Sequence, residues 1–90
     1  MKWIKVADGD ATTLPLLEKV VFICYRSGYD GAPVIQLGGR GDFGEEGWMW
    51  GALDTPYFVR NWEPKLYGFE ADDDYDVTHW AEIEWPEEYK

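Results

Sequence analysis

Hydrophobic residues occur along this chain in short runs that have the length and periodicity of β-strands. The clearest is the continuous run at residues 20–25, whose β-branched and aromatic side chains predict a central strand buried on both faces or nearly so. Residues 3–6 predict a short first strand that ends at the turn-forming sequence Asp8-Gly9-Asp10. Residues 34–37 predict the second strand of a hairpin with residues 20–25, joined by a loop rich in Gly, Pro and Asp.

Two further strands are expected nearer the C-terminus. Trp48 and Trp50 alternate with Met49, so the two indoles are expected to share one face of a strand. Residues 77–84 also alternate, and Pro86 ends that strand. The alternation places one set of side chains on one face (Val77, His79, Ala81 and Ile83) and the other set on the opposite face (Thr78, Trp80, Glu82 and Glu84).

The remaining segments predict turns and loops. A dense series of glycines predicts a turn or an irregular connection, since each glycine in a regular element costs up to about 1 kcal/mol; these are Gly38, Gly39, Gly41, Gly44 and Gly47. Residues 51–75 are expected to form mostly a long loop, with a short strand at residues 57–60. Thr12 or Thr13 would cap a helical turn that runs through residues 17 and 18, and Pro15 limits this helix to one turn.

Five candidate strands with almost no helix predict a mainly β fold. We expect a small twisted antiparallel sheet or a partly open barrel of about five strands, with at most one short helical turn. Residues 1–90 are expected to form a single domain, because a chain of this length buries only about 60 to 70% of its unfolded surface. Six Trp, six Tyr and four Phe supply enough apolar area for a core without a metal or a disulfide. Cys24 is the only cysteine and cannot form an internal disulfide.

The sequence is similar to a known family at both ends and at its centre. The matching segments are Trp3-Ile4-Lys5-Val6, Leu14-Pro15, Val20-Val21-Phe22-Ile23 and Val77-Thr78-His79-Trp80, with Pro86 behind the last. With these segments the chain resembles the small phage and bacterial proteins grouped as domain of unknown function family 551. The resemblance implies the family's fold and an origin in a phage or prophage. It implies no catalytic residue, because that family has no assigned activity.

The formal net charge of −10 is concentrated in the last third of the chain. Residues 63–90 contain ten acidic residues against Lys65 and Lys90, a net charge of −8, which leaves −2 for residues 1–62. Such a negative field disfavours nucleic acid and favours a partner protein with a basic surface. The same charge would also be explained by solubility alone.

Residues 1–10 contain no apolar segment of signal-peptide length, and no run approaches the roughly 18 apolar residues of a membrane span. We therefore expect a cytoplasmic protein, or one delivered into a host cytoplasm, that does not bind membranes.

His79 is the only histidine and would be a candidate general base beside Asp76. No Cys, Ser or second His completes a catalytic group near it in the sequence, so a structural role is favoured, in which Thr78 and His79 tie the last strand to the first. The protein is therefore expected not to be an enzyme.

Acidic residues at the end of the long loop resemble the opening of a calcium-binding loop; they are Asp72, Asp73, Asp74 and Asp76. Counted from Asp72, however, the sixth residue is Val77 rather than the required Gly, and the twelfth is Ile83 rather than Glu. A solvated acidic loop is the favoured interpretation, and no metal or cofactor is expected.

Tryptophans and acidic residues together form the candidate partner-binding face. Trp and Tyr dominate the energetics of protein interfaces, while Asp and Glu attract a basic partner. The candidates are Trp48, Trp50, Trp62, Glu70, Asp72, Asp73, Asp74, Asp76 and Trp80. The leading hypothesis is a non-enzymatic protein-binding module, and its sharper form is an inhibitor that imitates the charge of nucleic acid.

Three alternatives remain open. A small molecule or carbohydrate would stack on an exposed face made by Trp48 and Trp50. The indoles would otherwise merely cap the ends of a thin barrel. An unpaired sheet edge would allow weak self-association.

Overall fold

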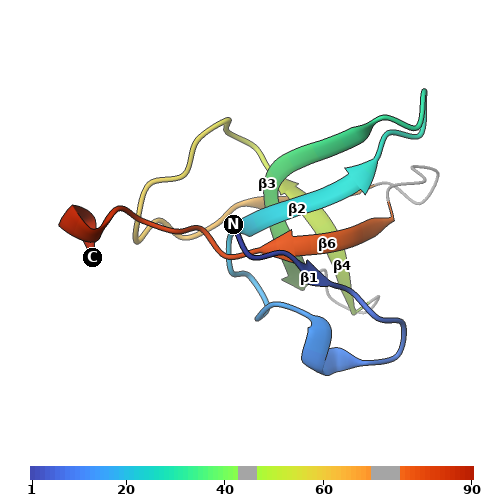
Figure 1. The fold of residues 1–90 in the computed structure, drawn as a ribbon, viewed down its shortest axis with the longest axis horizontal. Coiled ribbons are helices and arrows are strands. Elements are labelled where there is room, and N and C mark those ends of the chain that lie inside the picture. The colour runs from blue at the N-terminus through green and yellow to red at the C-terminus, as the bar shows by residue number, and fades with distance from the viewer. Residues whose placement is uncertain (43–46, 70–75) are drawn as a thin grey trace.

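The computed structural model describes residues 1–42, 47–69 and 76–90, and within these ranges it contains six antiparallel strands in one open sheet (Figure 1). The strands are β1 (Ile4–Lys5), β2 (Val21–Arg26), β3 (Pro33–Asp42), β4 (Trp48–Leu53), β5 (Leu66–Gly68) and β6 (Val77–Ala81). Their order in the sheet is β1-β6-β2-β3-β4-β5. The predicted mainly β class is confirmed, with six strands rather than about five.

The helical content of the described residues is two short 3-10 turns, Ala11–Thr13 and Glu87–Tyr89, one more than predicted. The first is capped by Asp10, whose side chain accepts a hydrogen bond from the Thr12 N–H at 3.0 Å. The prediction of a Thr cap with a turn through residues 17 and 18 is therefore wrong. Those residues lie against β3 instead, where the Glu18 N–H donates to the Arg40 carbonyl at 2.7 Å.

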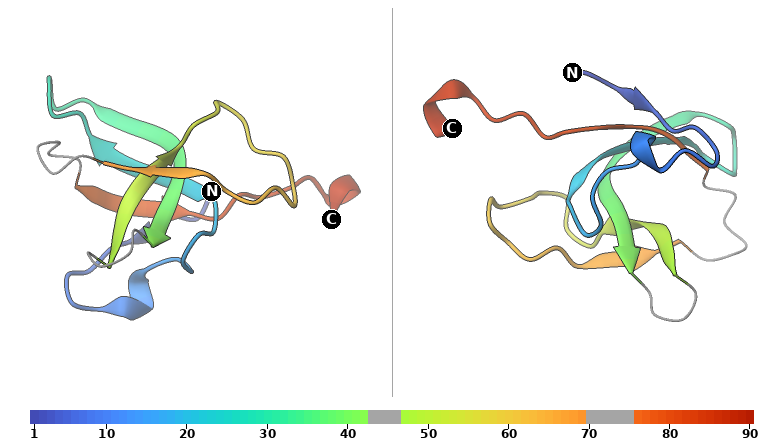
Figure 2. Two further views of the ribbon diagram at one scale, coloured as in Figure 1. Left: turned by 180° about the vertical axis from the view of Figure 1, so that it is seen from behind. Right: turned by 90° about the horizontal axis from the view of Figure 1, so that it is seen from below.

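β2 lies inside the sheet and pairs with β3 on one side and β6 on the other. Val21, Ile23 and Tyr25 are buried, whereas Phe22 and Cys24 on the opposite face are half-buried. The strand predicted to be buried on both faces or nearly so is thus fully buried on one face and half-buried on the other, because the sheet curls toward one side. Figure 2 shows this curl, with β4 and β5 lying across from β2 and β6.

β3 is the long bent strand that makes this curl. Its first half pairs with β2 and its second half with β4, and the two pairings meet at Gly38. The glycine-rich stretch predicted as a turn is therefore strand as far as Asp42. The glycines serve close approach of backbones: a Cβ at Gly38 would lie 2.3 Å from the carbonyl oxygen of Gly51, and one at Gly39 would lie 2.4 Å from that of Lys19.

The hydrophobic core fills the concave side of the curled sheet. Its buried members are Val21, Ile23, Tyr25, Val77 and Trp80, and the half-buried Ile4, Val6, Val34, Trp50 and Phe69 pack around them. The Trp80 indole N–H donates to the carbonyl of Thr13 at 2.7 Å, which fastens the 3-10 turn to the core.

β6 departs from the strict alternation that the sequence predicts. Tyr25 pairs with Val77 and Cys24 with His79, so Thr78 is an extra residue that forms a β-bulge. The bulge shifts the alternation of side chains by one residue. Val77 and Trp80 therefore both face the core although they are three residues apart. The strand ends at Ala81 rather than at residue 84.

The long segment after β4 also differs from expectation. Residues 57–60, predicted as a strand, lie in a loop, and the strand of this region is β5. Leu53 pairs with Leu66 across β4 and β5, which closes the loop. No helix among the described residues has the length and apolar character needed to cross a membrane.

Candidate functional site

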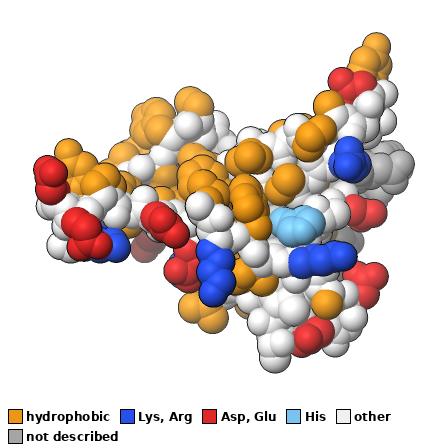
Figure 3. All heavy atoms as spheres, viewed as in Figure 1, with side chains coloured by type: hydrophobic (Ala, Val, Ile, Leu, Met, Phe, Trp, Pro, Cys, Tyr) orange, Lys and Arg blue, Asp and Glu red, His pale blue; other side chains and the backbone are white. Residues whose placement is uncertain are grey.

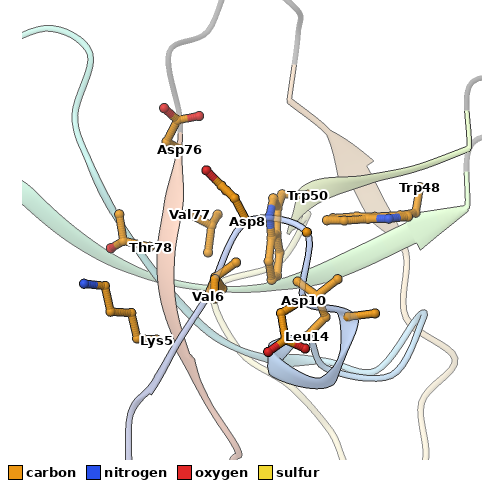
Figure 4. Close-up of a pocket in the computed structure, with 13 residues that line it drawn as sticks. Lys5, Val6, Asp8, Asp10, Leu14, Trp48, Trp50, Asp76, Val77 and Thr78 are labelled. Carbon is orange, nitrogen blue, oxygen red and sulfur yellow. The ribbon is translucent and has the colours of Figure 1, made fainter.

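A cleft of about 860 Å³ lies between the loop at residues 7–14, the start of β4 and the start of β6 (Figure 4). We call it the tryptophan cleft, because Trp48 and Trp50 lie along one side of it. Asp8 and Asp10 come from the loop, and Asp76 precedes β6. The β-bulge and the Trp80 bond to Thr13 position these walls, since they hold β6 and the loop against the core.

The two indoles stand at a right angle to each other. Their ring centroids lie 5.6 Å apart and their planes cross at 87°. Trp50 is half-buried against the core, while Trp48 is 40% exposed. The predicted sharing of one strand face is confirmed, because their partners on β3, Arg40 for Trp50 and Asp42 for Trp48, are also two residues apart.

Arg40 contacts the ring of Trp48 and fixes its position. The guanidinium carbon lies 4.8 Å from the centroid of the Trp48 ring, and Nε donates to the Pro15 carbonyl at 2.7 Å. Partial burial lowers the pKa of Arg40 from its usual value, but an arginine remains cationic at neutral pH. The Trp48 ring therefore already makes one cation–π contact within the chain.

The carboxylates of the cleft differ in their hydrogen-bond and ion-pair partners within the chain. Asp10 accepts hydrogen bonds from the Thr12 hydroxyl at 2.5 Å and from the Thr12 N–H, and these bonds lower the pKa of Asp10. Asp8 and Asp76 are exposed, and neither forms an ion pair with another described residue. Lys5 is the basic residue among the described lining residues, so the lining contains three carboxylates and one ammonium group.

The structure brings together three of the predicted site residues, namely Trp48, Trp50 and Asp76. Trp80 is 7% exposed and belongs to the core, so it contributes to stability rather than to a contact face. Four predicted residues, Glu70, Asp72, Asp73 and Asp74, lie outside the described residues. Asp8 was missed as a site residue, because the sequence Asp8-Gly9-Asp10 predicts a turn and gives no sign of what the turn faces.

Trp62 lies away from the tryptophan cleft, in the loop between β4 and β5. It lines a smaller cavity of about 320 Å³ together with Arg60 and Trp85, and its ring centroid lies 5.7 Å from that of Tyr57. Arg60 lies 4.4 Å from the Trp85 ring centroid and donates to the Tyr89 carbonyl. The Arg60 contacts join the C-terminal segment to this loop, and Trp62 is part of a surface separate from the tryptophan cleft.

The face of the sheet opposite the core carries the histidine. His79 pairs with Cys24 on one side and Lys5 on the other, and its Nδ1 lies 2.9 Å from the Thr78 hydroxyl oxygen. Sequence patterns do not predict the cysteine beside it, and no hydrogen bond joins His79 to Asp76, the predicted partner. Among the described residues no group of three or more His, Cys, Asp or Glu side chains is placed to hold a metal ion.

The face of the sheet that carries His79 is also apolar. Hydrophobic side chains gather on it (Figure 3), and Phe22, Ile35 and Leu37 line a shallow hollow of about 580 Å³ there. Ile35 is 61% exposed. Asp54 is the charged residue among the described lining residues, so this hollow lacks the paired aromatic and acidic character of the tryptophan cleft.

Fold and site together define a small mainly β protein with an acidic cleft walled by two perpendicular tryptophans. No protein-family model, curated protein or solved structure matches the chain. The resemblance to domain of unknown function family 551 thus stays a prediction, and the function has to be inferred from the geometry of the chain itself.

Proposed function

We propose that this protein is a non-enzymatic binding module that holds a basic segment of a partner protein in the tryptophan cleft. The observation that supports this proposal is the position of Trp48 and Trp50 beside Asp8 and Asp76, two carboxylates without a described ion-pair partner. An indole packs against the apolar stem of a Lys or Arg side chain, and the carboxylates attract its charged end.

The charge of the whole chain supports the same partner. With a net charge of −10, the protein attracts a basic surface over a longer range than the cleft alone, which raises the rate of association. A phage or prophage origin, implied by the family resemblance, would make this partner a host protein. In one form of this proposal the protein is an inhibitor that imitates nucleic acid. In that form, charge contributes more to the affinity than the aromatic contact does.

Capture from a bacterial lysate with three immobilised proteins tests the proposal: the wild type, Trp48→Ala, and Trp62→Ala as a control. Both tryptophans are partly exposed, at 40% and 46%, but Trp62 lies outside the cleft. We expect a basic protein to be retained by the wild type and Trp62→Ala and lost from Trp48→Ala. Equal capture by all three proteins would place the binding face elsewhere and contradict the proposal.

Salt separates the two forms of this proposal. Capture that collapses as salt rises supports imitation of nucleic-acid charge, since exposed charges are screened. Capture that survives high salt supports the aromatic contact as the main source of affinity.

A carbohydrate or other small molecule is a second candidate ligand. The cleft volume of about 860 Å³ falls within the range of about 300–1,000 Å³ that is usual for ligand pockets. Tryptophan fluorescence measured against a panel of sugars and metabolites tests this candidate. A response that is lost in Trp48→Ala and kept in Trp62→Ala would favour it over a protein partner.

A further inference from the structure

The right angle between Trp48 and Trp50 selects for the shape of a cation as well as for its charge. Figure 4 shows one indole standing upright and the other lying flat, so that their faces form a corner. A planar guanidinium stacks on one aromatic face at a time. A round ammonium group can contact two perpendicular faces at once, and each contact adds cation–π attraction.

Arg40 shows how a planar cation contacts a single ring of this pair, Trp48. Its guanidinium lies over the Trp48 ring, and Nε is held by the Pro15 carbonyl, so the contact is part of the fold. Trp48 nevertheless keeps 40% of its surface exposed. The contact thus fixes the orientation of Trp48 and occupies one face of its ring, so a ligand in the corner would use the other face.

Asp8 and Asp76 make the cleft as a whole negative. They come from different segments of the chain, and Figure 4 shows both on the side of Trp50 that faces away from Trp48, so their charge acts across the cleft rather than inside the corner. Both are exposed, so a cation near them keeps part of its hydration. A strongly hydrated primary ammonium gains little by leaving water for such a site, because the lost hydration offsets the attraction. A methylated ammonium is less hydrated and carries apolar surface that the indoles cover.

We propose that the corner between Trp48 and Trp50 binds a methylated ammonium group, presented as a trimethyllysine side chain on the basic segment of the partner. This inference rests on the proposed function, because it names the chemical group that the cleft recognises. The cleft is much larger than one ammonium group, so the residues on either side of the trimethyllysine have room beside Asp8 and Asp76.

Three peptides of one sequence, carrying lysine, trimethyllysine or arginine at the central position, test the inference by calorimetric titration. We expect trimethyllysine to bind about tenfold more tightly than lysine or arginine, the size of effect that cation–π contacts give at partly desolvated sites. Equal binding of the three peptides, or tighter binding of lysine or arginine, would overturn the inference and leave the proposed function standing.

Tetramethylammonium chloride, followed by shifts of the indole N–H signals in NMR spectra, separates failure of the subsite from failure of the proposed function. Shifts at Trp48 and Trp50 without any peptide binding would show an ammonium subsite but overturn the protein partner, and with it the trimethyllysine assignment. Absence of both responses would overturn both proposals.

Matched variants establish whether the contact is a cation–π contact. Trp48→Leu keeps an apolar side chain but removes the aromatic face, whereas Trp48→Phe keeps an aromatic face. We expect Trp48→Leu to lose the preference for trimethyllysine and Trp48→Phe to keep part of it, with Trp62→Leu as the control that keeps all of it. A peptide with the neutral carbon analogue of trimethyllysine should bind about as weakly as the lysine peptide. If the analogue binds as tightly as trimethyllysine, charge is not recognised and the inference fails.

Discussion

At the scale of single residues, exposure divides the tryptophans into structural and surface members. Trp80 is buried and its indole N–H is bonded to the Thr13 carbonyl, while Trp48 and Trp62 are 40% and 46% exposed. The sequence shows no such difference, because each of these residues stands among similar aromatic and acidic neighbours. Trp80 was therefore predicted as a binding residue on the same grounds as Trp48. What separates them is the curl of the sheet, which depends on contacts between distant segments.

We expect Trp80→Phe to lower stability without weakening binding. Phenylalanine keeps most of the buried apolar area but has no N–H, so the Thr13 carbonyl loses its donor at a cost of about 1–3 kcal/mol in the free energy of unfolding. Denaturant unfolding measures this loss, and calorimetric titration with the basic peptide measures affinity. Trp48→Phe is the reciprocal control, because it should change affinity more than stability. A Trp80→Phe protein of normal stability and reduced affinity would contradict the structural assignment.

At the scale of elements, the sequence predicts strands best where the pattern is local. The hairpin of β2 and β3 and the start of β6 were predicted, because runs of β-branched residues and alternation report the local strand preference. β5 was missed, since three residues, Leu66–Gly68, carry too short a pattern. The bulge at Thr78 was missed because it exists only in the pairing with β2. Self-association through a sheet edge stays a prediction, and the edge strands β1 and β5 offer two and three residues for it.

The glycines of β3 provide a test at this scale. We expect Gly39→Ala to destabilise the protein by about 1–3 kcal/mol, as overpacking of a filled site does. Its new Cβ would lie 2.4 Å from the Lys19 carbonyl oxygen, so the segment at residues 17–19, which lies against β3, has to move. Gly28→Ala is the matched control, because Gly28 is exposed in a turn and has no positive φ. Thermal and denaturant unfolding compare the two variants. Equal stability of both would mean that residues 17–19 do not pack on β3 as described.

At the scale of the whole molecule, the candidate site is assembled from segments that are far apart in the sequence. The cleft joins the loop at residues 7–14, the start of β4 and the start of β6. The sequence predicts Trp48, Trp50 and Asp76 as binding residues, because aromatic and acidic residues are typical of interfaces. Asp8 does not follow from the sequence pattern, because its place in the cleft depends on the Trp80 bond that holds its loop beside β6. Which side chains share a cleft is therefore a property of the tertiary structure.

The net charge of −10 also acts on the whole molecule, and salt should change stability and binding in opposite directions. The two ion pairs of the described residues, Lys19–Glu82 and Lys90–Glu87, are exposed and contribute little. Repulsion among the acidic residues therefore opposes the compact state. Raising sodium chloride from about 0.01 M to 1 M shortens the screening length from about 30 Å to about 3 Å. We expect the thermal midpoint to rise by about 4 °C or more, which for a domain of this size corresponds to about 1 kcal/mol.

The same salt should weaken the binding of a basic peptide, because the attraction to Asp8 and Asp76 is screened as well. The double variant Glu84→Gln and Glu88→Gln separates the two effects, since both residues are exposed and lie outside the cleft lining. It should reduce the gain in thermal midpoint while leaving most of the salt dependence of binding, which comes from the cleft carboxylates. Asp8→Asn should instead reduce the salt dependence of binding while leaving most of the gain in thermal midpoint. A thermal midpoint that falls as salt rises would show that attractive ion pairs, rather than repulsion, dominate the electrostatics of the fold.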